Sequence, residues 1–99
     1  MHSVVICRDQ PNSRDLRAAT RPEHLAHAKQ HTPRMLVAGA LLGADGKPVG
    51  SLFIFKSTSL EEARKIMDAD PYVRAGLFES VTIERWRWVV NRPDGVEEE

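Results

Sequence analysis

The chain has 99 residues, of which 41% are hydrophobic and 28% are charged, and its 14 basic side chains balance its 14 acidic ones. This length is typical of one domain, and the composition excludes a disordered or fibrous chain. The zero net charge also argues against a nucleic-acid-binding protein, which carries a basic excess.

The first predicted element is a strand over residues 3–8, because Val4, Val5 and Ile6 are β-branched and a turn-forming cluster follows them. Cys7, the single cysteine, is interpreted as a buried residue of this strand. It cannot form an internal disulfide, which favours a reducing compartment, and the chain has neither a signal-peptide pattern nor an apolar run long enough for a membrane span. We therefore expect a cytoplasmic protein without a membrane partner.

The next element is a helix that ends before Pro33, since proline disfavours the helical conformation in the residue before it. Thr20 and Glu23 have the spacing of a capping box, and Pro22 is tolerable in a first turn. The helix therefore begins at Thr20 or passes through it.

The remaining elements form a hairpin, a second helix and a last strand. They are predicted as strand 35–42, loop 43–48, strand 50–56, a helix opened by a second capping box at residues 59–62 and ending near residues 68–71, and strand 81–90. The order βαββαβ predicts an α+β fold, the ferredoxin-like sandwich, with both helices on one face of an antiparallel sheet.

Two further expectations concern the uncovered face of the sheet and the end of the chain. In strand 50–56 both faces are apolar, with Leu52 on one and Phe53 on the other. A second copy packed sheet to sheet would cover the free face, so we expect a homodimer. The domain is predicted to span residues 1–92, followed by an acidic tail at residues 93–99.

Motifs in the second half resemble a known family. They are Gly50-Ser51, Glu62-Ala63, Asp70-Pro71-Tyr72-Val73, Ala75-Gly76-Leu77, and the later Val81, Ile83 and Trp86. With Arg21 and His24, they resemble the YCII-related (YciI-like) family over residues 3–90. The resemblance implies a ferredoxin-like fold, a dimeric α+β barrel, a catalytic histidine and aspartate, and no common substrate. Some relatives are associated with dehalogenating lyase chemistry on chlorinated hydroxyquinols.

The resemblance places the histidine at His24 and the aspartate at Asp70, while Asp9 is a competing acidic candidate. A neutral imidazole can take or give a proton near neutral pH, and a carboxylate on its other nitrogen fixes the tautomer. The topology brings His24 and both acids to one end of the sheet. We expect His24 at the exposed start of its helix.

Three further residues are candidates for binding a substrate. Ser51 and Tyr72 can hydrogen-bond a substrate oxygen, and Arg21 can pair with a carboxylate or phenolate. The leading hypothesis is a small cofactor-independent enzyme that carries out lyase- or isomerase-like proton transfer on a small molecule. The alternative is a non-catalytic small-ligand-binding or accessory dimer.

Metal and RNA binding are weighed and set aside. His24, His27 and His31 share one broad helix face, but the outer two are too far apart along the helix axis to meet at one ion, and no cysteine pair accompanies them. We interpret this as a solvated histidine face and expect no metal or cofactor. The first strand has no aromatic residue on which an RNA base could stack.

Overall fold

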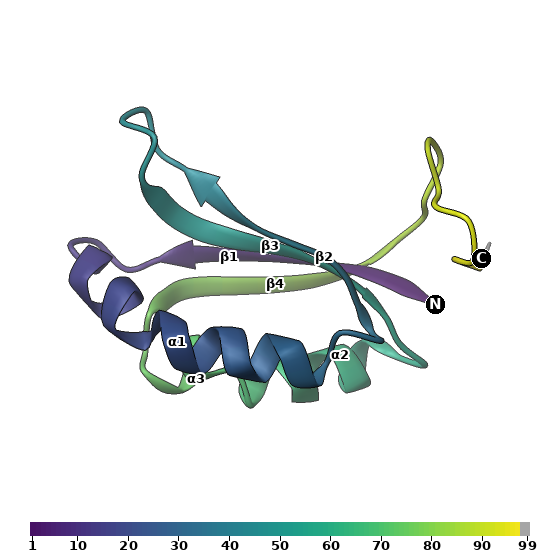
Figure 1. Ribbon diagram of the computed structural model, residues 1–99, viewed down its shortest axis with the longest axis horizontal. Coiled ribbons are helices and arrows are strands. Elements are labelled where there is room, and N and C mark those ends of the chain that lie inside the picture. The colour runs from purple at the N-terminus through teal and green to yellow at the C-terminus, as the bar shows by residue number, and fades with distance from the viewer. Residues whose placement is uncertain (98–99) are drawn as a thin grey trace.

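The computed structural model describes residues 1–97 and contains one four-stranded antiparallel sheet with strand order β2-β3-β1-β4. The elements are β1 (His2–Asp9), α1 (Arg14–Gln30), β2 (Met35–Leu42), β3 (Pro48–Lys56), α2 (Leu60–Asp68), α3 (Pro71–Arg74) and β4 (Phe78–Trp86). All three helices lie on the same side of the sheet (Figure 1). The ferredoxin-like α+β fold is confirmed.

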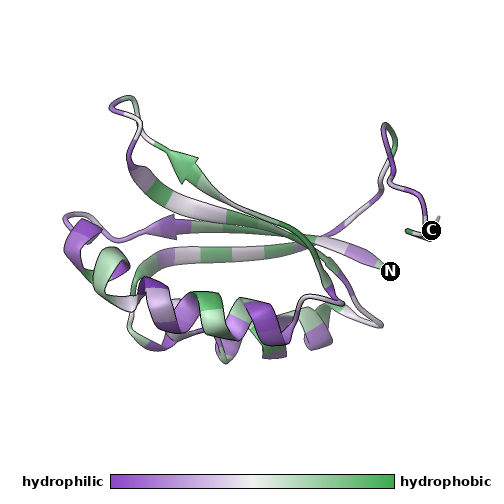
Figure 2. Ribbon diagram, in the orientation of Figure 1, coloured by the Kyte–Doolittle hydropathy of each residue, from purple (hydrophilic) through white to green (hydrophobic). Residues whose placement is uncertain are grey.

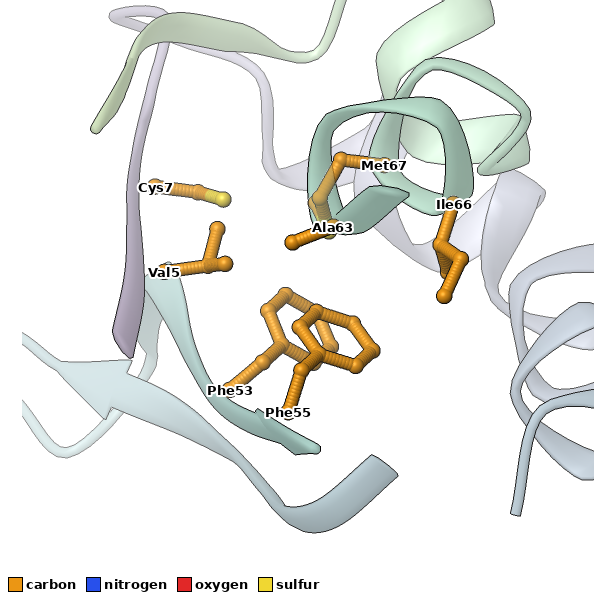
Figure 3. Packing of buried hydrophobic residues seen from close by; sticks show 7 residues of the cluster. All are labelled: Val5, Cys7, Phe53, Phe55, Ala63, Ile66 and Met67. Atoms are coloured by element: carbon orange, nitrogen blue, oxygen red, sulfur yellow. The ribbon is translucent and has the colours of Figure 1, made fainter. Parts of the chain in front are cut away.

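The core lies between the sheet and α2. Side chains alternate along a strand, so every second residue of β1 and β3 faces the helices, and α2 presents its apolar face to them. The cluster consists of Val5, Cys7, Phe53, Phe55, Ala63, Ile66 and Met67 (Figure 3). Each large apolar side chain buried there contributes roughly 1.5–3 kcal/mol to folding.

Cys7 is fully buried in this core, as predicted. Burial, together with the nearby charge of Asp70, raises the pKa of the Cys7 thiol to about 12. The thiolate is the reactive form of cysteine, so Cys7 acts as a packing residue rather than a nucleophile.

The α1 helix passes through the predicted capping box instead of beginning there. Its first hydrogen bond runs from the Arg17 N–H to the Ser13 carbonyl oxygen at 2.9 Å, and Pro22 lies in its interior. Proline removes one N–H donor, and the remaining turns keep the helix continuous. The second box does open α2, where the Ser59 hydroxyl oxygen accepts the Glu62 N–H at 3.1 Å.

The last strand differs from its predicted range of 81–90. It begins at Phe78, opposite Asp9, and ends at Trp86, which is paired with His2. Because β1 is its pairing strand and begins at His2, the chain beyond Trp86 has no partner for a longer ladder. Trp88 therefore lies outside the strand, with its ring packed against Trp86 at 5.1 Å between centroids.

The opposite face of the sheet is covered by no helix (Figure 1). The register aligns Val4 with Ile54, Ile6 with Leu52, and Ile54 with Val37, so apolar side chains from three strands share this face. Figure 2 shows hydrophobic residues recurring along the strands, and hydrophilic residues interspersed with hydrophobic ones along α1. Among residues 1–97, no helix is long and apolar enough to cross a membrane.

The end of the chain is only partly described. Residues 93–97 lie beyond the sheet, and the Val96 N–H donates to the Pro93 carbonyl oxygen at 3.2 Å. The last two acidic residues of the predicted tail, Glu98 and Glu99, lie outside the described residues.

Candidate active site

A buried histidine–aspartate pair joins α1 to α3. His24 Nδ1 lies 2.9 Å from Asp70 Oδ1 and 3.0 Å from Oδ2. Asp70 is fully buried and His24 is 9% exposed. His24 therefore lies in the middle of α1, and the expectation of an exposed imidazole at the start of the helix is wrong, because α1 begins well before Thr20.

Asp70 is held rigidly because it also caps α3. Its Oδ1 accepts the Tyr72 N–H at 2.9 Å, and Pro71 occupies the first helical position, where no N–H is needed. The same turn places the Tyr72 ring flat against the His24 imidazole, with 4.0 Å between centroids and 14° between planes. Asp70 on Nδ1 and Tyr72 on the ring face fix the orientation of His24, and Nε2 is the nitrogen left for a ligand.

Arg17, about two helical turns before His24, forms a second buried network. Its Nε and Nη2 donate to the two carboxylate oxygens of Asp9 at 2.7 and 2.9 Å, and Nη2 also donates to Ser51 Oγ at 2.9 Å. Burial disfavours the charged guanidinium, yet the Asp9 carboxylate outweighs it and raises the pKa of Arg17. The guanidinium carbon lies 4.8 Å from the centre of the Tyr72 ring.

These two networks border one cavity of about 220 Å³ between α1 and the β2–β3 edge of the sheet. Small residues on β2, Ala38 and Ala40, leave the space that α1 does not fill. The polar side chains that line the cavity are Arg17, Arg21, His24, Ser51 and Tyr72. Four of the predicted site residues line this one cavity, namely Arg21, His24, Ser51 and Tyr72.

The hydrogen-bond chemistry of this cavity favours an acceptor atom on the ligand. A guanidinium has no acceptor, so the Ser51 oxygen that receives the Arg17 bond keeps its own O–H for donation. Burial raises the pKa of the Tyr72 phenol, although Arg17 and Arg21 oppose that rise. Tyr72 is therefore a neutral phenol, and both hydroxyls can donate to an oxygen placed beside His24.

The positions of the two candidate acids differ. Asp70 contacts the imidazole, whereas Asp9 pairs with Arg17, whose Nη2 also donates to Ser51. Arg17 was not singled out by the sequence analysis, because nothing in the local sequence distinguishes it from neighbouring arginines on α1. The informative signal is the helix period, since residues 17, 20, 21 and 24 lie on one face.

The other two histidines, His27 in α1 and His31 at its C-terminal cap, do not form the solvated face that we expected. His27 Nε2 lies 3.1 Å from the Ile66 carbonyl oxygen, so its N–H docks α1 on α2, and burial lowers the pKa of His27. His31 lies against it, with ring centroids 4.5 Å apart. Within residues 1–97, no three histidine, cysteine or acidic side chains are grouped as a metal site would require.

Known proteins with similar sequences point to one family. Residues 1–87 match the YCII-related domain. The protein YciI of Escherichia coli O6:H1 is 34% identical over 94 residues, which span 87% of this chain and 96% of that protein. An uncharacterized protein of Haemophilus influenzae is 32% identical over 97 residues, spanning 90% of this chain and 99% of its own.

Solved structures extend this similarity. The 5-chloro-2-hydroxyhydroquinone dehydrochlorinase TftG of Burkholderia phenoliruptrix, in complex with 2,5-dihydroxybenzoquinone, superposes with a TM-score of 0.83 at 30% identity, covering 88% of this chain and 94% of that one. An antibiotic biosynthesis monooxygenase superposes with a TM-score of 0.56 at 14% identity, covering 90% and 99% of the two chains, a likeness of fold alone.

Proposed function

This chain belongs to the YCII-related family, and from that premise we propose that it is a small cofactor-independent enzyme in which His24 and Asp70 carry out lyase- or isomerase-like proton transfer on a small molecule. The observation that supports this most is the buried contact of 2.9 Å between His24 Nδ1 and Asp70 Oδ1 beside a cavity of the size of a small ligand. An oriented imidazole bordering a cavity is the arrangement that general acid–base catalysis requires.

The proposed chemistry assigns each group one task. His24 Nε2 takes a proton from the substrate, and the Asp70 carboxylate stabilises the imidazolium that results. The electron pair left behind forms a new double bond. In a lyase reaction a leaving group departs with its bonding electron pair, and in an isomerisation a proton adds at another atom of the substrate. Ser51 and Tyr72 donate hydrogen bonds to the substrate oxygen on which negative charge develops.

The first experiment uses the substrate of the similar dehydrochlorinase as a probe. We expect the protein to release chloride from 5-chloro-2-hydroxyhydroquinone, measured with a chloride electrode, or to speed exchange of the ring protons of 2,5-dihydroxybenzoquinone in D2O, measured by NMR. Exchange detects proton transfer even where no leaving group departs.

The alternative function is non-catalytic binding of a small ligand, and the same experiment separates the two. If 2,5-dihydroxybenzoquinone binds with the same affinity to the wild type and to a His24→Ala variant, and neither protein releases chloride or accelerates exchange, the enzyme proposal is wrong. The cavity would then serve to hold a ligand.

We further propose that the protein is a homodimer joined through the helix-free face of the sheet. Ile54 is buried on that face, but its apolar neighbours there, among them Val37 and Leu52, are exposed or only half buried in the single chain. Val37 and Leu60 are both 38% exposed, but Leu60 lies on α2, away from the sheet. Val37→Lys should therefore shift the sedimentation coefficient at micromolar concentration toward that of one chain, whereas Leu60→Lys should not. A wild type that sediments as one chain would contradict this arrangement.

We propose the cytoplasm as the compartment of this activity. Cys7, the single cysteine, is a buried free thiol in the core. Proteins that keep such free thiols are typical of reducing compartments.

A further inference from the structure

A second compartment extends the cavity toward the start of α1. It has a volume of about 320 Å³ and shares Arg17, Arg21 and Tyr72 with the compartment that holds His24. Its floor is apolar and includes Ala40 and Pro48, and no carboxylate lines it. The two compartments therefore adjoin along α1, and the imidazole lines the inner one.

Four cations line this outer compartment, and only two of them are neutralised. Arg17 is paired with Asp9, and Arg14 is paired with Asp45 at 2.7 Å. Arg21 and Lys47, by contrast, form no ion pair within residues 1–97. The compartment thus keeps two positive charges without an acidic partner.

An exposed ion pair joins two segments that border the compartment. The Arg14–Asp45 ion pair ties the start of α1 to the turn between β2 and β3, and Figure 1 shows these two segments at the same end of the molecule. Lys47 follows Asp45 in that turn, where its backbone N–H donates to Asp45 Oδ1 at 3.1 Å. An apolar floor with two uncompensated cations at the rim suits a small organic anion, and a guanidinium matches a carboxylate in shape and charge.

We propose that the outer compartment is a carboxylate subsite, and that the substrate is a small organic acid. Arg21 and Lys47 bind its carboxylate, while its reacting atoms lie beside His24 and Ser51. That the bound acid is a substrate rests on the proposed function. That the subsite binds a carboxylate is independent of the proposed function.

The test compares benzoate with benzamide, which has nearly the same shape but no charge. By titration calorimetry at low salt, we expect benzoate to bind at least about tenfold more tightly than benzamide, because charge-assisted hydrogen bonds exceed neutral ones. Arg21→Gln and Lys47→Gln should each weaken benzoate binding by about three- to tenfold and leave benzamide binding unchanged. Arg74→Gln is the matched control, since Arg74 is an exposed arginine on α3 that does not line either compartment.

Four outcomes separate the subsite from the proposed enzyme. Equal affinity for benzoate and benzamide would overturn the subsite, and so would a loss in Arg74→Gln as large as that in Arg21→Gln. Benzoate preference in a wild type that neither releases chloride nor accelerates proton exchange would support the subsite and reject the proposed enzyme. Chloride release without benzoate preference would do the reverse.

Discussion

Replacing His24 by alanine should lower the rate of chloride release or proton exchange by about 100- to 10,000-fold, the usual contribution of a general acid–base group. The physical reason is that Nε2 is the imidazole nitrogen left for the substrate once Asp70 occupies Nδ1. Because His24 is buried and stacked on Tyr72, the variant must first be shown to fold by circular dichroism and by its unfolding midpoint. An unchanged rate in a folded variant would reject the mechanism.

Asp70→Asn isolates the charge of the pair from its structural role. Asparagine is also a good N-cap, so its side-chain oxygen can still accept the Tyr72 N–H and keep α3 in place. What is lost is the carboxylate that orients and stabilises the imidazolium, and we expect the rate to fall about 100-fold or more. Asp9→Asn should act more weakly, because Asp9 contacts Arg17 and not the imidazole. A larger effect at Asp9 than at Asp70 would reverse the assignment.

Replacing Arg17 by methionine should destabilise the fold by about 3–5 kcal/mol, because it leaves a buried carboxylate without its partner. The side chains of Arg17 and Asp9 are 9% and 6% exposed, and the guanidinium satisfies both carboxylate oxygens. The measurement is the free energy of unfolding in urea. The loss should be visible without any substrate, which separates it from an effect on catalysis.

The chain supplies its own control for that prediction. Arg14 and Asp45 form an ion pair of the same length, 2.7 Å, from the same helix, but their side chains are 51% and 49% exposed. Arg14→Met should therefore cost much less than Arg17→Met, since water solvates both charges. A double variant, Arg17→Met with Asp9→Leu, should recover much of the lost stability by removing the orphaned charge. Equal losses at Arg14 and Arg17 would contradict the argument.

The sequence by itself determined the order of the elements, apart from the short α3 helix (Pro71–Arg74), and the sides on which they pack. Alternation in strand 50–56 placed Phe53 and Phe55 on one face, where they form the core, and the Ser59–Glu62 box does open α2. These signals are local, because strand alternation and capping depend on residues within one turn or one pleat of each other. The motif residues also sufficed to identify the family.

The tertiary structure alone decided where two elements begin and end. The Thr20–Glu23 spacing is a valid capping signal, but an upstream start at Arg14 overrides it, and α1 then buries His24 against α3. The last strand ends at Trp86 because its neighbour β1 begins at His2. The length of a strand depends on its pairing partner, which lies far away in the sequence.

The choice between two aspartates and the identity of Arg17 also required the fold. Asp9 and Asp70 are both acids at the same end of the sheet, and only the distances assign one to the guanidinium and the other to the imidazole. Arg14, Arg17 and Arg21 are alike in the sequence, yet their burial and partners differ, and these depend on which side chains β1, β3 and the β2–β3 turn bring against α1. Electrostatic roles follow from three-dimensional proximity and solvent exclusion, which residue spacing along a single chain does not encode.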